Sequence, residues 1–227
     1  MTISTCIFDA YGTLFDVTAA ARTAAAEPGR EALAALWPRL AEDWRRKQLE
    51  YSWLRTVMGR HADFRTVTAD ALDWALEAAG LADAGLRDRL LALYRDLAAY
   101  PEVPAVLAAL KRRGLATAIL SNGSPDMLAA AVHSAGIGGL LDDVLSVESV
   151  GVFKPDPRVS GQVAERFGPA PDAVLCVSAN GWDAAGAAAY GFRTAWVNRA
   201  HLPVDRLPAR PHHVVADLTP IPDLARP

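Results

Sequence analysis

Asp9 is the first residue in the chain whose type and position suggest chemistry. It follows the apolar run Cys6-Ile7-Phe8 and precedes the turn residues Gly12 and Thr13. A short run rich in β-forming residues is typical of a strand that is buried on both faces of a parallel sheet. Asp9 would then lie at the carboxyl end of that strand, where open α/β sheets bind their ligands. A carboxylate there could act as a nucleophile, although a lone Asp after a strand can equally begin a turn.

Three further strand ends in the sequence carry polar residues. They are Ser121-Asn122-Gly123-Ser124, the segment from Ser149 to Pro157 that contains Lys154, and Ser178-Ala179-Asn180-Gly181-Trp182-Asp183. Each has an ordinary structural explanation when taken alone, as a turn, a solvated lysine or a helix cap. Because the carboxyl ends of parallel strands meet at one edge of a sheet, all four segments would face the same crevice. Together they would supply two carboxylates, a cation, hydroxyl groups and amides, so the sequence predicts a site there.

Strand and helix patterns alternate from Pro101 to the end of the chain, as a shared crevice requires. After the first strand, we predict strands at residues 115–120, 144–147, 173–177, 194–197 and 213–216. Strands that are separated by helical segments are joined by right-handed crossovers and form a parallel sheet. We therefore predict an α/β fold whose Rossmann-like core is made of residues 1–15 and 100–227.

Residues 16–99 show helical periodicity and no strand pattern. Turn residues near 27–29, 59–61 and 79–80 divide this segment into four predicted helices, at about 17–26, 30–58, 65–79 and 84–97. The segment follows the first strand of the core directly. We therefore predict that it forms an inserted all-helical cap, the second of two domains.

The composition argues against several classes of protein. The chain has 227 residues, of which 52% are hydrophobic, and its formal net charge is −3. Nucleic-acid binding needs a clustered basic face, which this charge balance does not favour. No apolar run reaches the length of a membrane span, and the amino terminus lacks the pattern of a signal peptide. Cys6 and Cys176 lie in apolar strand-like runs and are interpreted as buried thiols, so we expect a cytoplasmic protein without a membrane partner.

The four polar segments resemble the four sequence motifs of the haloacid dehalogenase superfamily. The matching residues are Asp9-x-Tyr11-Gly12-Thr13-Leu14-Phe15-Asp16, Ser121-Asn122-Gly123, Lys154-Pro155-Asp156-Pro157 and Ser178-x-Asn180-x-Trp182-Asp183. The most specific part of the resemblance is to the cap of the 2-haloacid dehalogenases, over Trp44-Arg45-Arg46-Lys47-Gln48-Leu49-Glu50-Tyr51-Ser52-Trp53-Leu54-Arg55. The resemblance covers essentially the whole chain.

Two positions favour a dehalogenase over the phosphatases that make up most of this superfamily. The phosphatases have Asp-x-Asp at the first strand, where the second Asp protonates a leaving alkoxide, whereas this chain has Tyr11. A halide is the conjugate base of a strong acid and leaves without a proton. The phosphatases also bind Mg²⁺ through Gly-Asp-x-x-x-Asp, whereas this chain has Val177 and Ser178, which leaves few carboxylates for a hard cation. The resemblance therefore implies an enzyme that needs no metal and no other cofactor.

The resemblance also implies a reaction, the hydrolysis of short (S)-2-haloalkanoic acids to (R)-2-hydroxy acids with inversion. Asp9 would attack C2 of the 2-haloacid and displace the halide, and water would then hydrolyse the ester at the Asp9 carboxyl carbon. Lys154 would keep Asp9 ionised. Asp183 would hold Lys154 and help to orient or deprotonate the water, with Ser178 and Asn180 beside it.

The same comparison implies residues that bind the substrate. Arg45 and Asn122 would bind the departing halide, for which a guanidinium and an amide are suited. Ser121 and Thr13 would hold the substrate carboxylate or the nucleophile. The apolar wall that excludes water would be made of Tyr11, Leu49, Phe64 and Trp182.

Several residues of the cap also have simpler interpretations. Arg45 lies in a run of charges, and such a run on a helix is usually a solvated face. Trp44, Tyr51 and Trp53 have the near-helical spacing of a core or a subunit interface, which is consistent with a homodimer. His61 has no cysteine or carboxylate pattern around it and is interpreted as an ordinary side chain.

Two positions depart from the dehalogenase pattern. Ser160 stands where the family usually has a tyrosine, and Arg46 stands where a glutamine is common. The shorter Ser160 would loosen the site, and Arg46 would add a cation near the mouth of the pocket. Both would affect the rate and the preferred halide or chain length, but neither changes the nucleophile.

Three functions from different classes stay open on the sequence alone. The first is a metal-independent 2-haloacid dehalogenase, and the second is a phosphatase or another small-acid hydrolase of the same fold. The third is a non-catalytic protein that binds small anions. The complete set of Asp9, Lys154 and Asp183 favours an enzyme, and sensitivity to EDTA distinguishes the first function from the second.

Overall fold

The computed structural model describes residues 2–81 and 83–225, and its centre is a six-stranded sheet. Neighbouring strands are parallel and follow the order β3-β2-β1-β4-β5-β6, so β1 lies between β2 and β4. The strands are β1 Thr5–Phe8, β2 Ala116–Ser121, β3 Asp143–Ser146, β4 Val174–Ser178, β5 Arg193–Val197 and β6 His213–Val215. The predicted α/β fold class is confirmed, and each predicted strand is present.

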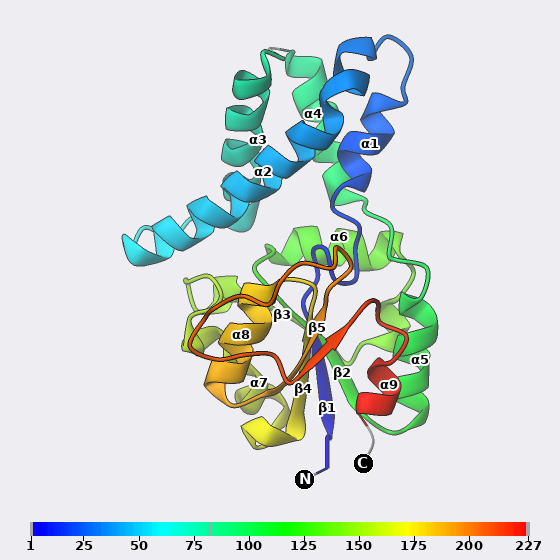
Figure 1. Ribbon diagram of the computed structural model, residues 1–227, viewed down its shortest axis with the longest axis vertical. Coiled ribbons are helices and arrows are strands. Elements are labelled where there is room, and N and C mark those ends of the chain that lie inside the picture. The colour runs from blue at the N-terminus through cyan, green and yellow to red at the C-terminus, as the bar shows by residue number, and fades with distance from the viewer. Residues whose placement is uncertain (1, 82, 226–227) are drawn as a thin grey trace.

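Helices cover both faces of the sheet, with α7 and α8 on one side and α5 and α9 on the other (Figure 1). Of these, α5, α7 and α8 lie in the connections between consecutive strands, as parallel pairing requires, whereas α9 follows β6. The elements are α5 Val103–Arg112, α6 Pro125–Ser134, η1 Gly138–Leu140, η2 Val147–Ser149, α7 Pro157–Phe167, η3 Pro171–Ala173, α8 Gly181–Tyr190 and α9 Ile221–Leu224.

β1 is the strand that positions the first candidate residue. All four of its residues are buried, as expected for a central strand with helices on both faces. Phe8 lies in register with Ile119 of β2 and Val177 of β4. The backbone N–H of Asp9 then donates to the carbonyl of Val177 at 2.9 Å, so Asp9 begins where the strand ends.

Four helices stand beyond the carboxyl ends of the strands (Figure 1). They are α1 Ala19–Ala25, α2 Glu31–Val57, α3 Phe64–Ala79 and α4 Ala84–Arg95, and their ends lie within two residues of the predicted ones. Asp63 caps α3 by accepting from the backbone N–H of Thr66 at 2.7 Å. Within the described residues, no helix is long and apolar enough to cross a lipid bilayer.

The chain crosses from the sheet to these four helices and later returns, and the two connecting segments are hydrogen-bonded to each other. The backbone N–H of Asp16 donates to the carbonyl of Ala98 at 3.2 Å, and that of Tyr100 donates to the carbonyl of Leu14 at 2.9 Å. Phe15 and Ala99 form an antiparallel bridge between them. The division into domains at residues 15–16 and 99–100 stays a prediction, to which this pairing lends support.

Candidate active site

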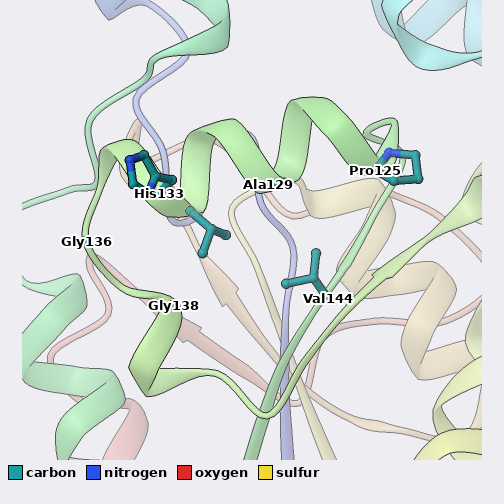
Figure 2. Close-up of a pocket in the computed structure, with 7 residues that line it drawn as sticks. Pro125, Ala129, His133, Gly136, Gly138 and Val144 are labelled. Carbon is teal, nitrogen blue, oxygen red and sulfur yellow. The ribbon is translucent and has the colours of Figure 1, made fainter.

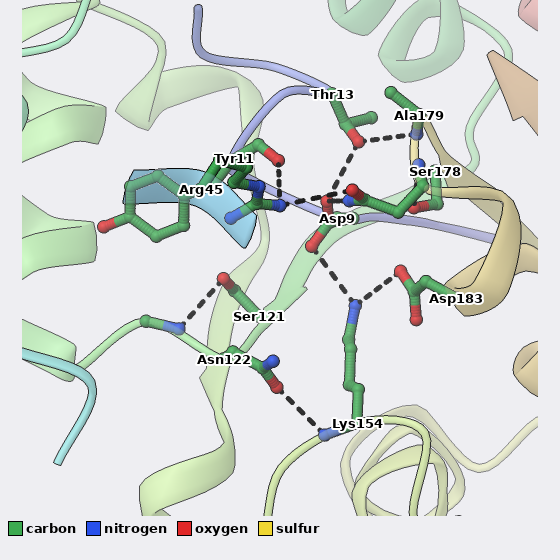
Figure 3. Close-up of polar contacts among 12 residues, drawn as sticks. Asp9, Tyr11, Thr13, Arg45, Ser121, Asn122, Lys154, Ser178, Ala179 and Asp183 are labelled. Atoms are coloured by element: carbon green, nitrogen blue, oxygen red, sulfur yellow. Dashed lines mark hydrogen bonds and ion pairs between the residues drawn. The ribbon is translucent and has the colours of Figure 1, made fainter. Parts of the chain in front are cut away.

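The Asp9 carboxylate is buried, with 7% of the residue exposed, and its Oδ2 atom accepts two hydrogen bonds (Figure 3). Thr13 Oγ1 donates to it at 3.0 Å and Asn180 Nδ2 at 2.9 Å. Gly12 makes this geometry accessible, because its positive φ of 88° turns the chain so that Thr13 faces back toward Asp9. One oxygen of the carboxylate is thus held by two donors.

Lys154 lies between the two carboxylates of the site. Its Nζ is 3.4 Å from Asp9 Oδ1 and 3.0 Å from Asp183 Oδ2, and all three residues are buried. Burial by itself lowers the pKa of Lys154, but the carboxylates of Asp183 and Asp9 outweigh it and hold the pKa above its ordinary value. Burial raises the pKa of Asp183, and the Lys154 ammonium opposes that rise. The lysine is therefore a permanently charged partner for two carboxylates.

The loop after β2 holds the backbone around Lys154. Asn122 Oδ1 accepts from the backbone N–H of Lys154 at 2.9 Å, so this side-chain oxygen is committed to the loop. Ser121 Oγ accepts from the backbone N–H of Gly123 at 3.1 Å, which orders the same turn. The three predicted segments after β1, β2 and β3 are thus brought together.

The segment after β4 is tied to the same centre. Thr13 Oγ1 accepts from the backbone N–H of Ala179 at 2.8 Å while donating to Asp9. Ser178 Oγ accepts from the backbone N–H of Asn180 at 3.1 Å. These bonds fix the loop that carries the Asn180 amide toward Asp9.

Arg45 is the cap residue that reaches this centre from α2. Its Nη2 donates to the carbonyl of Tyr11 at 3.3 Å and to Asn180 Oδ1 at 3.2 Å. Asn180 therefore accepts from Arg45 with its oxygen and donates to Asp9 with its nitrogen. A guanidinium from the cap lies one side chain away from the Asp9 carboxylate.

The four predicted wall residues divide into two pairs. Leu49 and Trp182 line a cavity of about 690 Å³ that also contacts Arg45 and Asn180. Tyr11 and Phe64 are instead buried in an aromatic cluster with ring centroids 5.6 Å apart, and Figure 3 shows the Tyr11 hydroxyl directed away from Asp9. The structure does not place Tyr11 and Phe64 among the residues that line this cavity.

Three contacts at the site were not anticipated from the sequence. Gln48 accepts from Arg45 Nη1 at 2.7 Å, and Tyr94 from α4 approaches the Gln48 amide at 3.2 Å. The chain after β5 also lines the cavity, from Asn198 to Arg206. The position of Gln48, three residues after Arg45 on a helix, was an available signal, because residues at that spacing are neighbours. Nothing in the sequence pointed to Tyr94 or to the chain after β5.

Two expectations about the cap are corrected. The sequence showed no carboxylate partner for His61, but its Nε2 lies 2.8 Å from Glu148 Oε2, a pairing between residues 87 positions apart. Arg46 does not add a cation to the pocket mouth. Its guanidinium pairs with Asp43 at 2.8 Å and packs over the ring of Trp74, and the side chain is half exposed.

A second cavity of about 550 Å³ lies beside α6 (Figure 2). Its lining includes Pro125 and His133, near the two ends of that helix, and Val144 from β3. It contains none of the predicted site residues. Over residues 2–81 and 83–225, no group of three or more His, Cys, Asp or Glu side chains is arranged to hold a metal ion.

Comparison with known proteins now identifies the family. Residues 3–191 match the model of the haloacid dehalogenase-like hydrolases. The chain belongs to this family. The resemblance seen in the sequence motifs is therefore confirmed, and the family places the chain among the hydrolases.

Relatives in this family match over nearly the whole chain. (S)-2-haloacid dehalogenase 1 of Pseudomonas sp. (strain CBS-3) is 44% identical over 98% of this chain and 96% of its own length. (S)-2-haloacid dehalogenase 4A of Burkholderia cepacia is 45% identical over 86% of this chain and 82% of its own. The solved L-2-haloacid dehalogenase of Xanthobacter autotrophicus with covalently bound chloropropionic acid is 40% identical, with a TM-score of 0.85 and 98% of each chain covered.

Proposed function

We propose that this chain hydrolyses short (S)-2-haloalkanoic acids to (R)-2-hydroxy acids through an ester on Asp9. An oxygen of the Asp9 carboxylate attacks C2 of the haloacid from the side opposite the halogen. The C–O bond forms as the C–halogen bond breaks, the halide leaves with the electron pair, and C2 is inverted. Water then attacks the Asp9 carboxyl carbon, and the hydroxy acid leaves with the oxygen that Asp9 supplied.

The observation that carries this proposal is the buried carboxylate of Asp9 with its two oxygens in different surroundings. Oδ2 is held by Thr13 and Asn180 at 3.0 and 2.9 Å, whereas the one polar contact of Oδ1 with a described side chain is the longer one, at 3.4 Å, with Lys154. Oδ1 is therefore the less engaged oxygen and the better nucleophile. The two donors on Oδ2 fix the direction in which Oδ1 attacks.

Lys154 and Asp183 would serve both steps. The ammonium of Lys154 stabilises the Asp9 carboxylate before the attack and again when the ester is hydrolysed. Asp183 lies 3.0 Å from Lys154, and burial raises its pKa, which suits a group that accepts a proton from water. The proton of the attacking water thus passes to Asp183, and solvent later removes it.

Arg45 and Asn122 would bind the halide as it leaves. Arg45 contacts Asn180, which in turn donates to Asp9, and the Nη2 contacts of Arg45 at 3.2 and 3.3 Å are long for a charged donor. Such bonds are exchanged readily for an anion. The halide leaves without a proton, so no general acid is needed. The two carboxylates at this edge of the sheet have a lysine ammonium between them, and such an arrangement does not match a divalent-cation site. The reaction is therefore proposed to be metal-independent.

The test is a single turnover in H₂¹⁸O with the enzyme in excess over 2-chloropropionate. We expect ¹⁸O in the peptide that contains Asp9 and none in the first-turnover lactate, because the lactate oxygen comes from Asp9. Label in the lactate with none in the peptide would overturn the ester mechanism. The same assay with EDTA should proceed unchanged, whereas a Mg²⁺-dependent hydrolase of this fold would lose activity.

We further propose that the enzyme is a cytoplasmic homodimer. The carboxyl-terminal end of α2 and the residue that follows it expose four large apolar side chains, which are Trp53, Leu54, Val57 and Met58. An apolar patch of this kind is typical of a protein interface, and a second copy of the chain would cover it. Cys6 and Cys176 are both buried free thiols, as suits a reducing compartment.

A further inference from the structure

Gln48 is a polar side chain buried inside the cap, with 1% of the residue exposed. It lies three residues after Arg45 on α2, and its Oε1 accepts from Arg45 Nη1 at 2.7 Å. This is the shortest of the hydrogen bonds that Arg45 makes, since its bonds to Tyr11 and Asn180 are 3.3 and 3.2 Å. A buried amide of this kind is costly unless it is fully hydrogen-bonded.

The orientation of the Gln48 amide follows from the hydrogen-bond chain behind it. Thr68 Oγ1 donates its single proton to the carbonyl of Phe64 at 2.6 Å. It can therefore only accept from Gln48 Nε2, which lies 2.8 Å away. The amide nitrogen faces Thr68, so the amide oxygen must face Arg45.

Two further residues prevent this arrangement from rotating. Tyr94 approaches the amide from α4, with its hydroxyl 3.2 Å from Gln48 Nε2 and 3.3 Å from Oε1. Trp44 Nε1 donates to the carbonyl of Thr68 at 2.9 Å and so holds α3 against α2. The Gln48 amide is therefore fixed by contacts from three helices of the cap.

We propose that Gln48 is a positioning residue that holds the Arg45 guanidinium in the orientation needed at the active site. With Nη1 held by Gln48, Nη2 is directed toward Tyr11 and Asn180, next to the Asp9 carboxylate. Without the Gln48 oxygen, the long arginine side chain would sample several rotamers. This inference rests on the proposed function, in which Arg45 binds the departing halide.

A double-mutant cycle separates positioning from a general structural role. Gln48→Met keeps the volume and removes the acceptor, and it should lower kcat/KM for 2-chloropropionate by ~10- to 100-fold. In the Arg45→Ala background the same change should alter kcat/KM by less than about twofold, because the group it positions is gone. Equal losses in both backgrounds would show a structural role and overturn the inference.

Two further variants provide a control for Gln48→Met and an alternative to it. Ser52→Ala removes a buried hydroxyl on the same helix that donates only to the Gln48 backbone carbonyl at 2.8 Å, and it should leave kcat/KM near the wild-type value. Thr68→Val removes the hydroxyl that orients the amide. It should reproduce part of the Gln48→Met loss, again only when Arg45 is present, and it tests the inference if Gln48→Met does not fold.

An NMR measurement of the Arg45 side chain tests the inference independently of activity. Hindered rotation of a held guanidinium gives resolved Nη signals, and these should merge in Gln48→Met but not in Ser52→Ala. Resolved signals that persist in Gln48→Met would overturn the inference. An enzyme that releases no chloride but shows the expected Arg45 signals would instead contradict the proposed function alone.

Discussion

At the scale of single residues, the site depends on one hydroxyl group that makes two hydrogen bonds. Thr13 Oγ1 donates to Asp9 Oδ2 at 3.0 Å and accepts from the backbone N–H of Ala179 at 2.8 Å. It therefore joins Asp9, the proposed nucleophile after β1, to the loop after β4. A hydroxyl is the smallest side-chain group that can both donate and accept at such a position.

Thr13→Val should remove both bonds while keeping the shape of the side chain. A hydrogen bond to a charged group contributes about 1.5–3 kcal/mol, so we expect kcat to fall by about 10- to 100-fold. Steady-state halide release measures this loss. Thr13→Ser keeps the hydroxyl and should retain most of the activity, and wild-type kcat in Thr13→Val would exclude the assigned role.

Lys154 illustrates why buried charges at this site occur as a set. An unpaired buried ammonium would lose its proton, but two carboxylates keep the pKa of Lys154 above its ordinary value. The lysine therefore stays charged throughout the pH range in which the protein would act. Removing either carboxylate leaves a buried charge with half its partners, so such variants are expected to lose stability as well as activity.

At the scale of elements, the start of α3 decides where the cap meets the sheet domain. The Asp63 side chain caps this helix by accepting from the backbone N–H of Thr66. The backbone N–H of Phe64, the first residue of the helix, donates to Glu148 Oε1 at 3.1 Å. The bond from Thr66 lowers the pKa of Asp63 below its ordinary value of 3.8. The Asp63 side chain therefore stabilises the start of α3 most when it is ionised.

Asp63→Ala should lower the free energy of unfolding by about 1 kcal/mol at pH 7. Asp63→Asn keeps a capping oxygen and should cost only a few tenths of a kcal/mol, as is usual among good capping residues. Because the folded pKa is lowered, the Asp63 contribution is complete above pH 3.8 and is lost as the pH falls through the folded value. Urea unfolding at pH 7 and at a pH below the folded pKa of Asp63 measures this. A loss of unfolding free energy in Asp63→Ala that is as large in acid as at pH 7 would contradict it.

The turn between β2 and α6 requires a residue without a side chain. A Cβ atom at Gly123 would lie 2.8 Å from Tyr11 Cε2 and 2.9 Å from two carbon atoms of Leu128. This close approach lets the Tyr11 ring pack against the turn that carries Ser121 and Asn122. Gly123 is therefore required by this close packing and not by a positive φ.

Gly123→Ala should lower the free energy of unfolding by about 1–3 kcal/mol, because Tyr11 or Leu128 must move. A matched control is Gly139→Ala, where the added Cβ has no atom within 4 Å and should change stability by less than about 0.5 kcal/mol. Chemical denaturation of both variants provides the comparison. Equal stability of the two variants would show that the turn relaxes without cost.

At the scale of the whole molecule, α2 connects the site to the surface. Arg45 near its middle reaches the active site, while Val57 at its end is 84% exposed. Trp53, between them, packs edge to face on Trp182, which lines the cavity next to Arg45 and Asn180, with ring centroids 5.3 Å apart. A partner that covers the end of α2 would therefore also support the wall of the cavity.

The proposed homodimer is tested by placing a charge on this patch. Val57→Asp should convert the protein from the mass of two chains to that of one in sedimentation, because a buried unpaired carboxylate is costly. Arg39→Glu, at an exposed position in the first half of the same helix, serves as the control and should stay dimeric. A wild-type protein that sediments as a single chain would refute the proposed dimer.

The sequence by itself determined the order of strands and helices and the four segments at the carboxyl ends of the strands. These features are local, because strand patterns, turn residues and helix periodicity depend on neighbours in the chain. The convergence of Asp9, Lys154 and Asp183 also followed, since parallel pairing brings strand ends to one edge. Family resemblance then assigned roles that spacing alone left open, such as that of Arg45.

Tertiary structure alone decided which side chains support those residues. Gln48 and Tyr94 meet across 46 positions of sequence, and His61 and Glu148 meet across 87. The sequence-based reading of Arg46 as a pocket cation was wrong because the rotation of α2 about its axis, which packing sets, directs this side chain toward Asp43 and Trp74. Contacts between helices depend on packing geometry, for which a single sequence carries no local signal.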